Sequence, residues 1–425
     1  MVENGPSSNW AALRNSNFRV IWFAAVISGT GAFAHRTAAT WAMNELSRSA
    51  LLLSIMSTCS SLPFFLFTLP AGALADMVDR GKLVAIVQIW LAAVAAGIPI
   101  LGRLHPLNSY LILLSVLLIG AGFAFNAPAF SSLLTDVVSE KELPSASVLT
   151  GLLFDLSAVI GSALAGAVIP LIGTDIVFVG NSVAFLLVSL ALLWWRRSKE
   201  QAHTVMENFF QSFAAAARYV RYTPGMQVVL ARQILFSVLA AAVPALLPVV
   251  GLKEMHIGAA KLGLLYTSMG IGSVVAAGFI LPWGRAHYSP NTLTRLATYL
   301  LALVIFSMAF VRQTQLLVVL SAFAGVAWTC AGLELWLAGQ RAMPAWARGR
   351  MNATVIMFSQ GATALGGVVY GTTAQMWGVT PVLMAVAGLI VILLLTLQLF
   401  SFPLSIDFAK ELSFDASELR KPRSG

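Results

Sequence analysis

The sequence predicts an all-α membrane protein in which twelve transmembrane helices form two six-helix halves. Three observations lead to this fold class: the composition, twelve long apolar runs, and the distribution of Lys and Arg between those runs. The 425 residues are 58% hydrophobic and only 10% charged, with a mean hydropathy of +0.84. Because soluble proteins carry about 25% charged residues, these charges are too few for a soluble surface, and a lipid bilayer is the expected solvent.

Twelve apolar runs are each long enough to cross a membrane, which takes about 20 residues of α-helix. Short stretches rich in Gly, Pro, Asn and charged residues separate the runs, and helices are expected to end there. The runs are centred near Ala32, Pro63, Ala92, Gly122, Val159, Leu186, Leu239, Gly270, Val304, Trp328, Leu365 and Ile390. The interruptions fall at residues 47–49, 76–82, 104–108, 139–144, 173–175, 194–226, 252–261, 284–291, 311–315, 341–350 and 378–381.

The basic residues orient the twelve runs. If the N-terminus is inside the cell, 19 of the 26 Lys and Arg fall on the cytoplasmic side. The outer loops then hold Arg48, Arg103, Lys253, Lys261 and Arg312. Lys and Arg in short loops favour the cytoplasmic side, and residues 1–19 lack the pattern of a signal peptide. We therefore expect a multi-pass protein of a bacterial cytoplasmic (inner) membrane with both ends in the cytoplasm.

The longest interruption divides the runs into six and six. The predicted domains are an N-terminal half (1–195), a cytoplasmic linker (196–226), a C-terminal half (227–403) and a cytoplasmic tail (404–425). Within the linker, Phe209, Phe213 and Val220 are spaced for one face of a helix, which predicts an amphipathic helix along the membrane surface. Such a helix either ties the halves together or binds a partner.

The stretch GALADMVDRGK, residues 72–82, concentrates charge between the second and third runs. Gly72 has no side chain, so a neighbouring helix can approach closely there. Asp76 at a helix end can accept hydrogen bonds from the N-terminus of another helix, where the dipole favours an anion. With Arg80 and Lys82, this cluster can hold the cytoplasmic ends of the halves together in one state. The alternative is an ordinary basic loop that serves topology alone.

This stretch resembles the signature loop of the major facilitator superfamily, and the matching residues are Gly72, Leu74, Asp76, Arg80, Gly81 and Lys82. Residues 324–371 resemble spans 10 and 11 of the bacterial enterobactin-exporter-like, or transmembrane secretion effector, group of drug:proton antiporters. The matching residues there are Ala324, Gly325, Ala327, Trp328, Gln340, Pro344, Trp346, Arg348, Gly349 and Arg350.

The resemblance implies the major facilitator fold, with inverted repeats of three helices in each half. It also implies a secondary active transporter that exports a small amphiphilic molecule (a drug, siderophore or secondary metabolite) by alternating access and proton-coupled antiport. We assign Gly72, Asp76, Arg80 and Lys82, together with Arg348 and Arg350, to a conformational latch, and these six are called the latch residues below.

In two places the chain departs from the drug/proton antiporter pattern. Gly161 is followed by Ser162 rather than Pro, and the fourth run carries no Arg.

Ionisable residues at membrane depth are costly and therefore usually functional. Glu334 and Asp155 are the candidates for proton coupling, because burial disfavours the charged form of a carboxyl group. Either is also compatible with a static salt bridge. By resemblance, spans 1, 4, 7 and 10 line the central cavity, which makes Arg36, His35 and Trp328 the candidates for substrate binding. Arg36 is equally suited to pairing with a carboxylate, and His35 to packing.

Small residues four apart allow helices to meet backbone to backbone. Such patterns occur in span 5 at Ala158, Ser162 and Gly166, in span 8 at Ser268, Gly272 and Ala276, and in span 11 at Gly367 and Gly371. By resemblance, spans 2, 5, 8 and 11 form the seam between the halves. The same patterns are also common in helix packing of any membrane bundle.

The sequence shows no sign of an enzyme. Its five His residues lie in five different segments, and it has no HExxH, no GxSxG and no Walker A loop. Cys59 and Cys330 lie far apart in apolar runs and predict neither a disulfide nor a metal site.

We expect no cofactor and no nucleic acid. The expected partners are a small-molecule substrate, protons and the bilayer, and the chain is expected to be a monomer. The alternatives are an uncoupled facilitator or importer and a nontransporting membrane scaffold.

Overall fold

The computed structural model describes residues 11–139, 142–195, 220–342 and 348–399. The first half contains α1 (Ser16–Leu46), α2 (Ala50–Met77), α3 (Arg80–Leu104), α4 (Ser109–Asp136), α5 (Leu143–Ile172) and α6 (Thr174–Trp195), after a short 3₁₀ turn η1 (Ala11–Arg14). The second half contains α8 (Pro224–Ala240), α9 (Ala242–Val249), η3 (Val250–Glu254), α10 (Ala259–Val275), η4 (Ala276–Ile280), α11 (Leu281–His287), α12 (Pro290–Phe310), α13 (Thr314–Ala342), α14 (Arg348–Trp377) and α15 (Val379–Leu399).

These helices confirm the twelve predicted spans. Among the described residues, 12 helical stretches are long and apolar enough to cross a membrane, and each contains one of the predicted centres. Spans 7 and 8 are composite: α8, α9 and η3 form one, and α10, η4 and α11 form the other. The five-residue η3 and η4 have π-helical hydrogen bonding, an irregularity that often occurs at functional sites.

The charged interruption between spans 2 and 3 is shorter than predicted. The α2 helix continues to Met77, and α3 already begins at Arg80. The carboxylate of Asp79 accepts a hydrogen bond from the backbone N–H of Lys82 at 2.8 Å and so caps α3. Because a side-chain cap satisfies a free N–H of the first turn, the new helix starts only two residues after the previous one ends.

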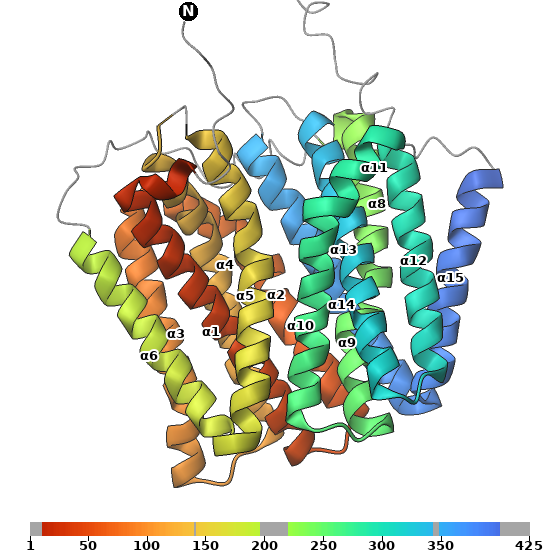
Figure 1. Ribbon diagram of the computed structural model, residues 1–425, viewed down its shortest axis with the longest axis horizontal. Helices are drawn as coiled ribbons and strands as arrows, with labels where there is room; N and C mark the ends of the chain where they lie inside the picture. The colour runs from red at the N-terminus through yellow and green to blue at the C-terminus, as the bar shows by residue number, and fades with distance from the viewer. Residues whose placement is uncertain (1–10, 140–141, 196–219, 343–347, 400–425) are drawn as a thin grey trace, which may run out of the picture.

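An even number of spans brings the start of α1 and the end of α15 to one side of the molecule (Figure 1). We call this side the terminal face, and the side with the turns at residues 47–49, 105–108 and 255–258 the opposite face. The linker and tail predicted for residues 196–226 and 404–425 lie largely outside the described residues, so their limits stay predictions.

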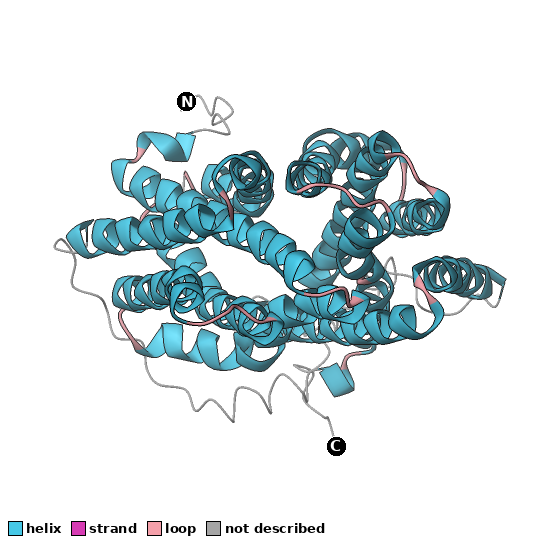
Figure 2. Ribbon diagram, turned by 90° about the horizontal axis from the view of Figure 1, so that it is seen from below, coloured by secondary structure: helices cyan, strands magenta, loops and turns pink. Residues whose placement is uncertain are grey.

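The two halves lie side by side across the bundle, α1 to α6 in one group and α8 to α15 in the other (Figure 1). The view along the helices shows both groups end-on (Figure 2). The halves meet mainly along two contacts, α2 against α14 and α5 against α10, which we call the two seams, and α2 also contacts α9. Spans 2, 5, 8 and 11 therefore form the seam between the halves, as the resemblance implied.

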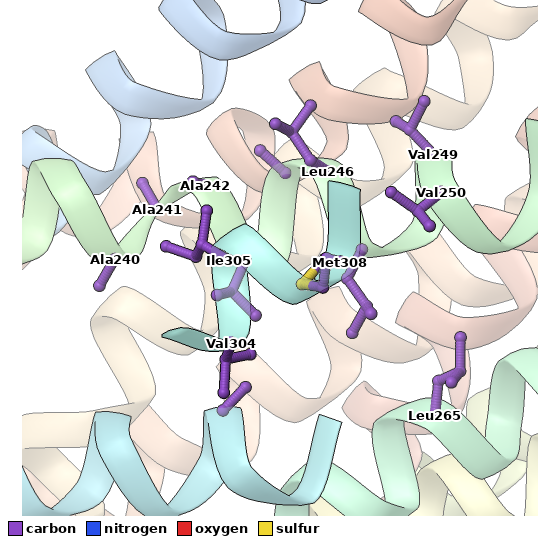
Figure 3. Close-up of a cluster of buried hydrophobic side chains, with 14 of the residues drawn as sticks. Ala240, Ala241, Ala242, Leu246, Val249, Val250, Leu265, Val304, Ile305 and Met308 are labelled. Atoms are coloured by element: carbon purple, nitrogen blue, oxygen red, sulfur yellow. The ribbon is translucent and has the colours of Figure 1, made fainter. Parts of the chain in front are cut away.

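The second half has a well-packed apolar interior. Side chains of α9 and α12, among them Leu246, Ile305 and Met308, are no more than 1% exposed and gather in one cluster (Figure 3). On the outer surface of α12, by contrast, Leu303 is 61% exposed and Phe310 is 56% exposed. Large exposed apolar side chains on a spanning helix are expected where it faces lipid rather than water.

Candidate functional site

The α2–α14 seam is a close backbone contact in the half of the helices near the opposite face. The Thr58 hydroxyl donates to the Ala364 carbonyl at 2.8 Å. A Cβ on Gly367 would lie 2.5 Å from the Thr58 hydroxyl, and one on Gly371 would lie 2.7 Å from the Ser54 Cβ. Both positions are therefore reserved for Gly, as the spacing in span 11 predicted.

The α5–α10 seam is closer still. A Cβ on Gly263 would lie 2.5 Å from the Gly166 Cα and 2.7 Å from the Ser162 carbonyl oxygen. Two turns further along, a Cβ on Gly270 would lie 2.8 Å from the Val159 side chain. The predicted small-residue face of span 5 is confirmed, with Gly against Gly at its centre.

The prediction for span 8 was wrong in detail. Ser268 donates to the Val318 carbonyl at 3.0 Å, and Gly272 lies against the Ala322 carbonyl, so this stripe packs against α13 inside the same half. The face of α10 that meets α5 carries Gly263 and Gly270 instead. Two stripes of small residues run along one helix, and spacing alone does not say which one faces the other half.

Polar contacts also join the halves at the opposite face. The Lys253 ammonium donates to the Ser47 carbonyl at 2.7 Å and to the Asn44 carbonyl at 3.3 Å. The Gln375 side-chain oxygen accepts from the Ser49 hydroxyl at 3.1 Å. These hydrogen bonds link η3 and α14 of the second half to the turn between α1 and α2. The two halves are therefore joined at the opposite face.

Contact between the halves fades toward the terminal face. Along α2, the side chain of Phe65 still lies 2.5 Å from a Cβ built on Gly361 of α14. Two turns later, a Cβ on Gly72 would meet no atom within 4 Å, and the same holds for Gly151 of α5. The close approach that we expected at Gly72 is absent in this state of the molecule.

Among the described latch residues, Arg80 contacts other parts of the first half. Arg80 donates from Nη1 to Asp136 at 2.6 Å and from Nε to the Ala75 carbonyl at 3.4 Å. Lys82 is exposed. Arg348 and Arg350 lie in the first turn of α14, at the same face; their side chains, like that of Asp76, lie outside the described residues. A latch between the halves stays a prediction.

Glu334 is buried in the second half and paired. Only 1% of its side chain is exposed, and Oε1 accepts from Nε of Arg285 at 2.6 Å. Arg285 lies in α11 and is 39% exposed. The pair therefore joins a buried carboxylate of α13 to a cation that reaches the surface near the terminal face.

Asp155 is in a different setting. It is half-buried near the middle of α5, and within the described ranges it has no hydrogen-bond or ion-pair partner. Residues 155, 159, 162 and 166 share one helical face, and Val159 and Gly166 of this face pack against α10. Asp155 thus lies on the seam face of α5, one turn closer to the terminal face than the contact at Val159.

The side chains of Arg36 and His35 have different surroundings, although the two residues are adjacent in the sequence. The Arg36 guanidinium lies 5.7 Å from the centre of the Tyr266 ring on α10, a cation–π contact between the halves. His35 is 1% exposed, lies 3.4 Å from the Ser115 hydroxyl and packs its ring against Phe178. His35 is therefore a packing residue of the first half in this state, whereas Arg36 faces the second half.

Trp328 of α13 packs against α8, a helix that also carries a polar contact that the sequence did not single out. The Trp328 ring meets that of Phe236 on α8 at 6.1 Å between centres. Elsewhere on α8, Ser237 (2.7 Å) and Gln233 (3.2 Å) both hydrogen-bond Ser359 of α14. The available signal was two polar residues four apart, Gln233 and Ser237, in an otherwise apolar span.

The described residues contain no group of three His, Cys, Asp or Glu side chains placed to hold a metal ion. The described groups of this region are polar and aromatic side chains, two intramembrane carboxylates, and two seams lined by small residues.

The chain resembles known proteins over most of its length. A family model described as transmembrane secretion effector matches residues 7–421. The multidrug efflux pump Tap of Mycolicibacterium fortuitum is 23% identical over 378 residues, or 87% of this chain and 91% of that protein. Macrolide efflux protein A of Streptococcus pyogenes is 20% identical over 251 residues, or 59% of this chain and 61% of that protein.

Solved structures share the fold at low identity. A POT family transporter in complex with 5-aminolevulinic acid has a TM-score of 0.72 and 11% identity, covering 91% of this chain and 96% of that one. A bacterial homologue of the human lysosomal transporter Spinster, in an inward-facing and unoccupied conformation, has a TM-score of 0.65 and 13% identity, covering 96% and 99%.

Proposed function

This chain belongs to the transmembrane secretion effector family of major facilitator superfamily transporters, and we propose that it exports a small amphiphilic molecule by alternating access. Both the family and the structural neighbours are transporters rather than enzymes. Alternating access in this class is a rocking of one half against the other around a site between them.

The observation that carries the proposal is the unequal contact along the two seams. Near the opposite face the halves meet through Gly263 against Gly166 and Gly371 against Ser54, whereas a Cβ built on Gly72 would meet no described atom within 4 Å. Such an arrangement is expected of a transporter closed at one face and open at the other. The contacts rely on close approach with few hydrogen bonds, which a second state can break at low cost.

The direction of opening follows from charge. From the sequence, 19 of the 26 Lys and Arg are expected on the side of the two termini, and this bias favours a cytoplasmic location for the terminal face. The state described here is then open to the cytoplasm and closed to the outside. An exporter in this state takes up its substrate from the cell interior.

The substrate class is proposed from two lines of support. The relatives are named for efflux of macrolides and of multiple drugs. In this chain, α8 carries one aromatic contact, Phe236 with Trp328 of α13, and one polar contact, Gln233 and Ser237 with Ser359 of α14. Aromatic walls with a few polar groups suit an amphiphilic molecule. Siderophores and secondary metabolites remain within this class.

Coupling to protons is proposed for Asp155 first and Glu334 second. Asp155 has no partner among the residues that the structure describes, and it lies where α5 must approach α10 if the terminal face closes. Burying an unpaired carboxylate is costly, so closure would require its neutralisation by a proton or by a cationic substrate. Glu334 already has Arg285 as a counter-charge, which makes proton exchange less necessary there.

Proteoliposomes with a trapped pH dye test this function. Purified protein is given a macrolide, a lipophilic cation or a catecholate siderophore, and substrate and proton movement are recorded together. We expect at least one substrate to drive proton flux, with Asp155→Asn abolishing the flux. Glu334→Gln tests the second candidate, and Asp175→Asn, at an exposed end of α6, is the matched control.

Two outcomes favour the alternatives. Substrate movement without proton flux in the wild type would indicate a facilitator or importer without proton coupling. No substrate movement across a broad panel, in protein shown to be folded and inserted, would indicate a nontransporting scaffold.

A further inference from the structure

A lipid-facing groove separates α1 from α6 on the first half. Its volume is about 460 Å³, and its walls include Arg19, Phe23 and Ile27 of α1 with Ala184, Leu187 and Ala191 of α6. The two helices run antiparallel here, so the start of α1 lies beside the end of α6. The groove therefore belongs to the part of the bundle nearest the terminal face.

All but one of the lining side chains are apolar, and the walls are open to the outside of the bundle. Phe23 is 50% exposed, Ile27 is 47% exposed and Leu187 is 60% exposed. Both helices are membrane spans, so the surroundings of this groove are acyl chains rather than water. From Arg19 to Ile27 the groove extends over eight residues, about 12 Å of helix at 1.5 Å per residue.

The exception is Arg19, which is exposed at the terminal-face end of the groove. Trp194, 75% exposed, lies near the terminal-face end of α6. Exposed Trp residues at span ends mark the level of lipid headgroups. Arg19 is thus at headgroup depth, directly above an apolar channel.

From this combination we infer that the α1–α6 groove binds an anionic phospholipid of the cytoplasmic leaflet, with its phosphate on Arg19 and an acyl chain between α1 and α6. The charge matches the occupant, because the cytoplasmic leaflet carries anionic lipids and a basic group between spans on that side recognises their headgroups. The positive end of the α1 dipole adds to the attraction. This site is separate from the proposed transport route and does not depend on it.

Photoactivatable lipids test the inference on the full-length protein in nanodiscs. One probe is phosphatidylglycerol with a reactive group in its acyl chain, and the other is phosphatidylcholine with the same chain. Adducts are mapped by mass spectrometry to the peptides that contain residues 19–27 and 184–191. We expect about fivefold more labelling by phosphatidylglycerol, the preference that one Arg near an anionic lipid surface confers.

Two variants separate the headgroup from the chain. Arg19→Gln is expected to lower labelling by phosphatidylglycerol to the level of phosphatidylcholine. Ala184→Phe, which fills the half-buried wall of the groove, is expected to lower labelling by both lipids. Arg14→Gln, an exposed Arg outside the groove, is the matched control and is expected to change neither.

Three results would overturn the inference. The first is equal labelling by the two lipids in the wild type, and the second is a phosphatidylglycerol preference that survives Arg19→Gln. The third is cross-linking of this groove to a second copy of the chain, or to its own residues 196–219, in place of lipid. Arg19 is exposed, so loss of folding is not expected to obscure the comparison.

Discussion

Two intramembrane carboxylates differ sharply in their surroundings. Glu334 is fully buried and bonded to Arg285, whereas Asp155 is half-buried without a partner in the described part of the chain. A buried charge whose partner is removed destabilises a protein strongly, even where the intact pair contributes little. We therefore expect breaking the Glu334–Arg285 pair to change the stability of the protein, and substitution of Asp155 to change its transport.

Arg285→Gln is expected to lower stability by about 3 kcal/mol, because it leaves the Glu334 carboxylate buried and unpaired. Glu334→Gln is expected to cost less, since Arg285 is 39% exposed and can reach water. Thermal unfolding of the purified variants in detergent measures both effects. The double variant, which carries both Arg285→Gln and Glu334→Gln, should regain most of the stability that Arg285→Gln alone loses.

Arg103→Gln, at an exposed position of the opposite face, is the control and should unfold like the wild type. A double variant no more stable than Arg285→Gln alone would contradict the coupling of this pair.

For single residues, the sequence predicted which side chains are unusual better than it predicted which residues those side chains contact. Glu334 stood out because an acid inside an apolar run is costly. Its partner lies 49 positions away on another span, and pairing at that separation depends on tertiary packing. His35 stood out for the same reason, yet its ring packs inside the first half against Phe178.

The seams are the elements on which movement depends. Gly166 and Gly263 bring the backbones of α5 and α10 together, and Gly367 and Gly371 do the same for α2 and α14. Spacing predicted the stripes of spans 5 and 11, because a single small-residue face on each helix meets the other half. Span 8 has two such faces, and Gly272 belongs to the one that packs against α13.

Gly263→Ala is expected to weaken the closed opposite face. Its Cβ would lie 2.5 Å from the Gly166 Cα, so α5 and α10 must separate, and overpacking of this kind costs about 1–3 kcal/mol. The population open at the opposite face should then rise roughly 5- to 150-fold. The labelling rate of a single Cys at Thr267, by a maleimide that cannot cross the membrane, measures this opening.

Gly388→Ala is the matched control, because a Cβ there meets no atom within 4 Å. An unchanged labelling rate in Gly263→Ala would show that the Gly contact does not hold the opposite face closed.

For the whole molecule, the twelve spans and the two halves were predictable from apolar length and loop charge. The composite structure of spans 7 and 8 was not predictable, because a π-helical turn does not interrupt the apolar run of the sequence. The sequence also did not predict at which face the two halves would lie apart. Gly72 was expected to lie against a neighbouring helix, but a Cβ built there would meet no atom within 4 Å.

Asp76→Asn is expected to slow transport several-fold while leaving folding and insertion intact, because it weakens the proposed closure of the cytoplasmic face. Initial transport rates in proteoliposomes, compared at equal amounts of inserted protein, measure this effect. Asp79→Asn is the matched control, since Asn also caps a helix well and Asp79 caps α3. A wild-type rate in Asp76→Asn would contradict the latch.

The central claim is that the halves alternate between a state open to the terminal face and a state open to the opposite face. Spin labels on Cys residues at His105 and Gln313 report distances across the opposite face, and labels at Ser139 and His287 report distances across the terminal face. All four positions are exposed, and Cys59 and Cys330 are replaced beforehand.

Double electron–electron resonance on these two pairs, with and without substrate and at low and high pH, is the most direct test. The account predicts reciprocal changes: where the opposite-face distance lengthens, the terminal-face distance shortens, and Gly263→Ala shifts both in that direction. Distances that stay fixed at both faces under every condition, in protein that transports substrate, would contradict alternating access by rocking of the two halves.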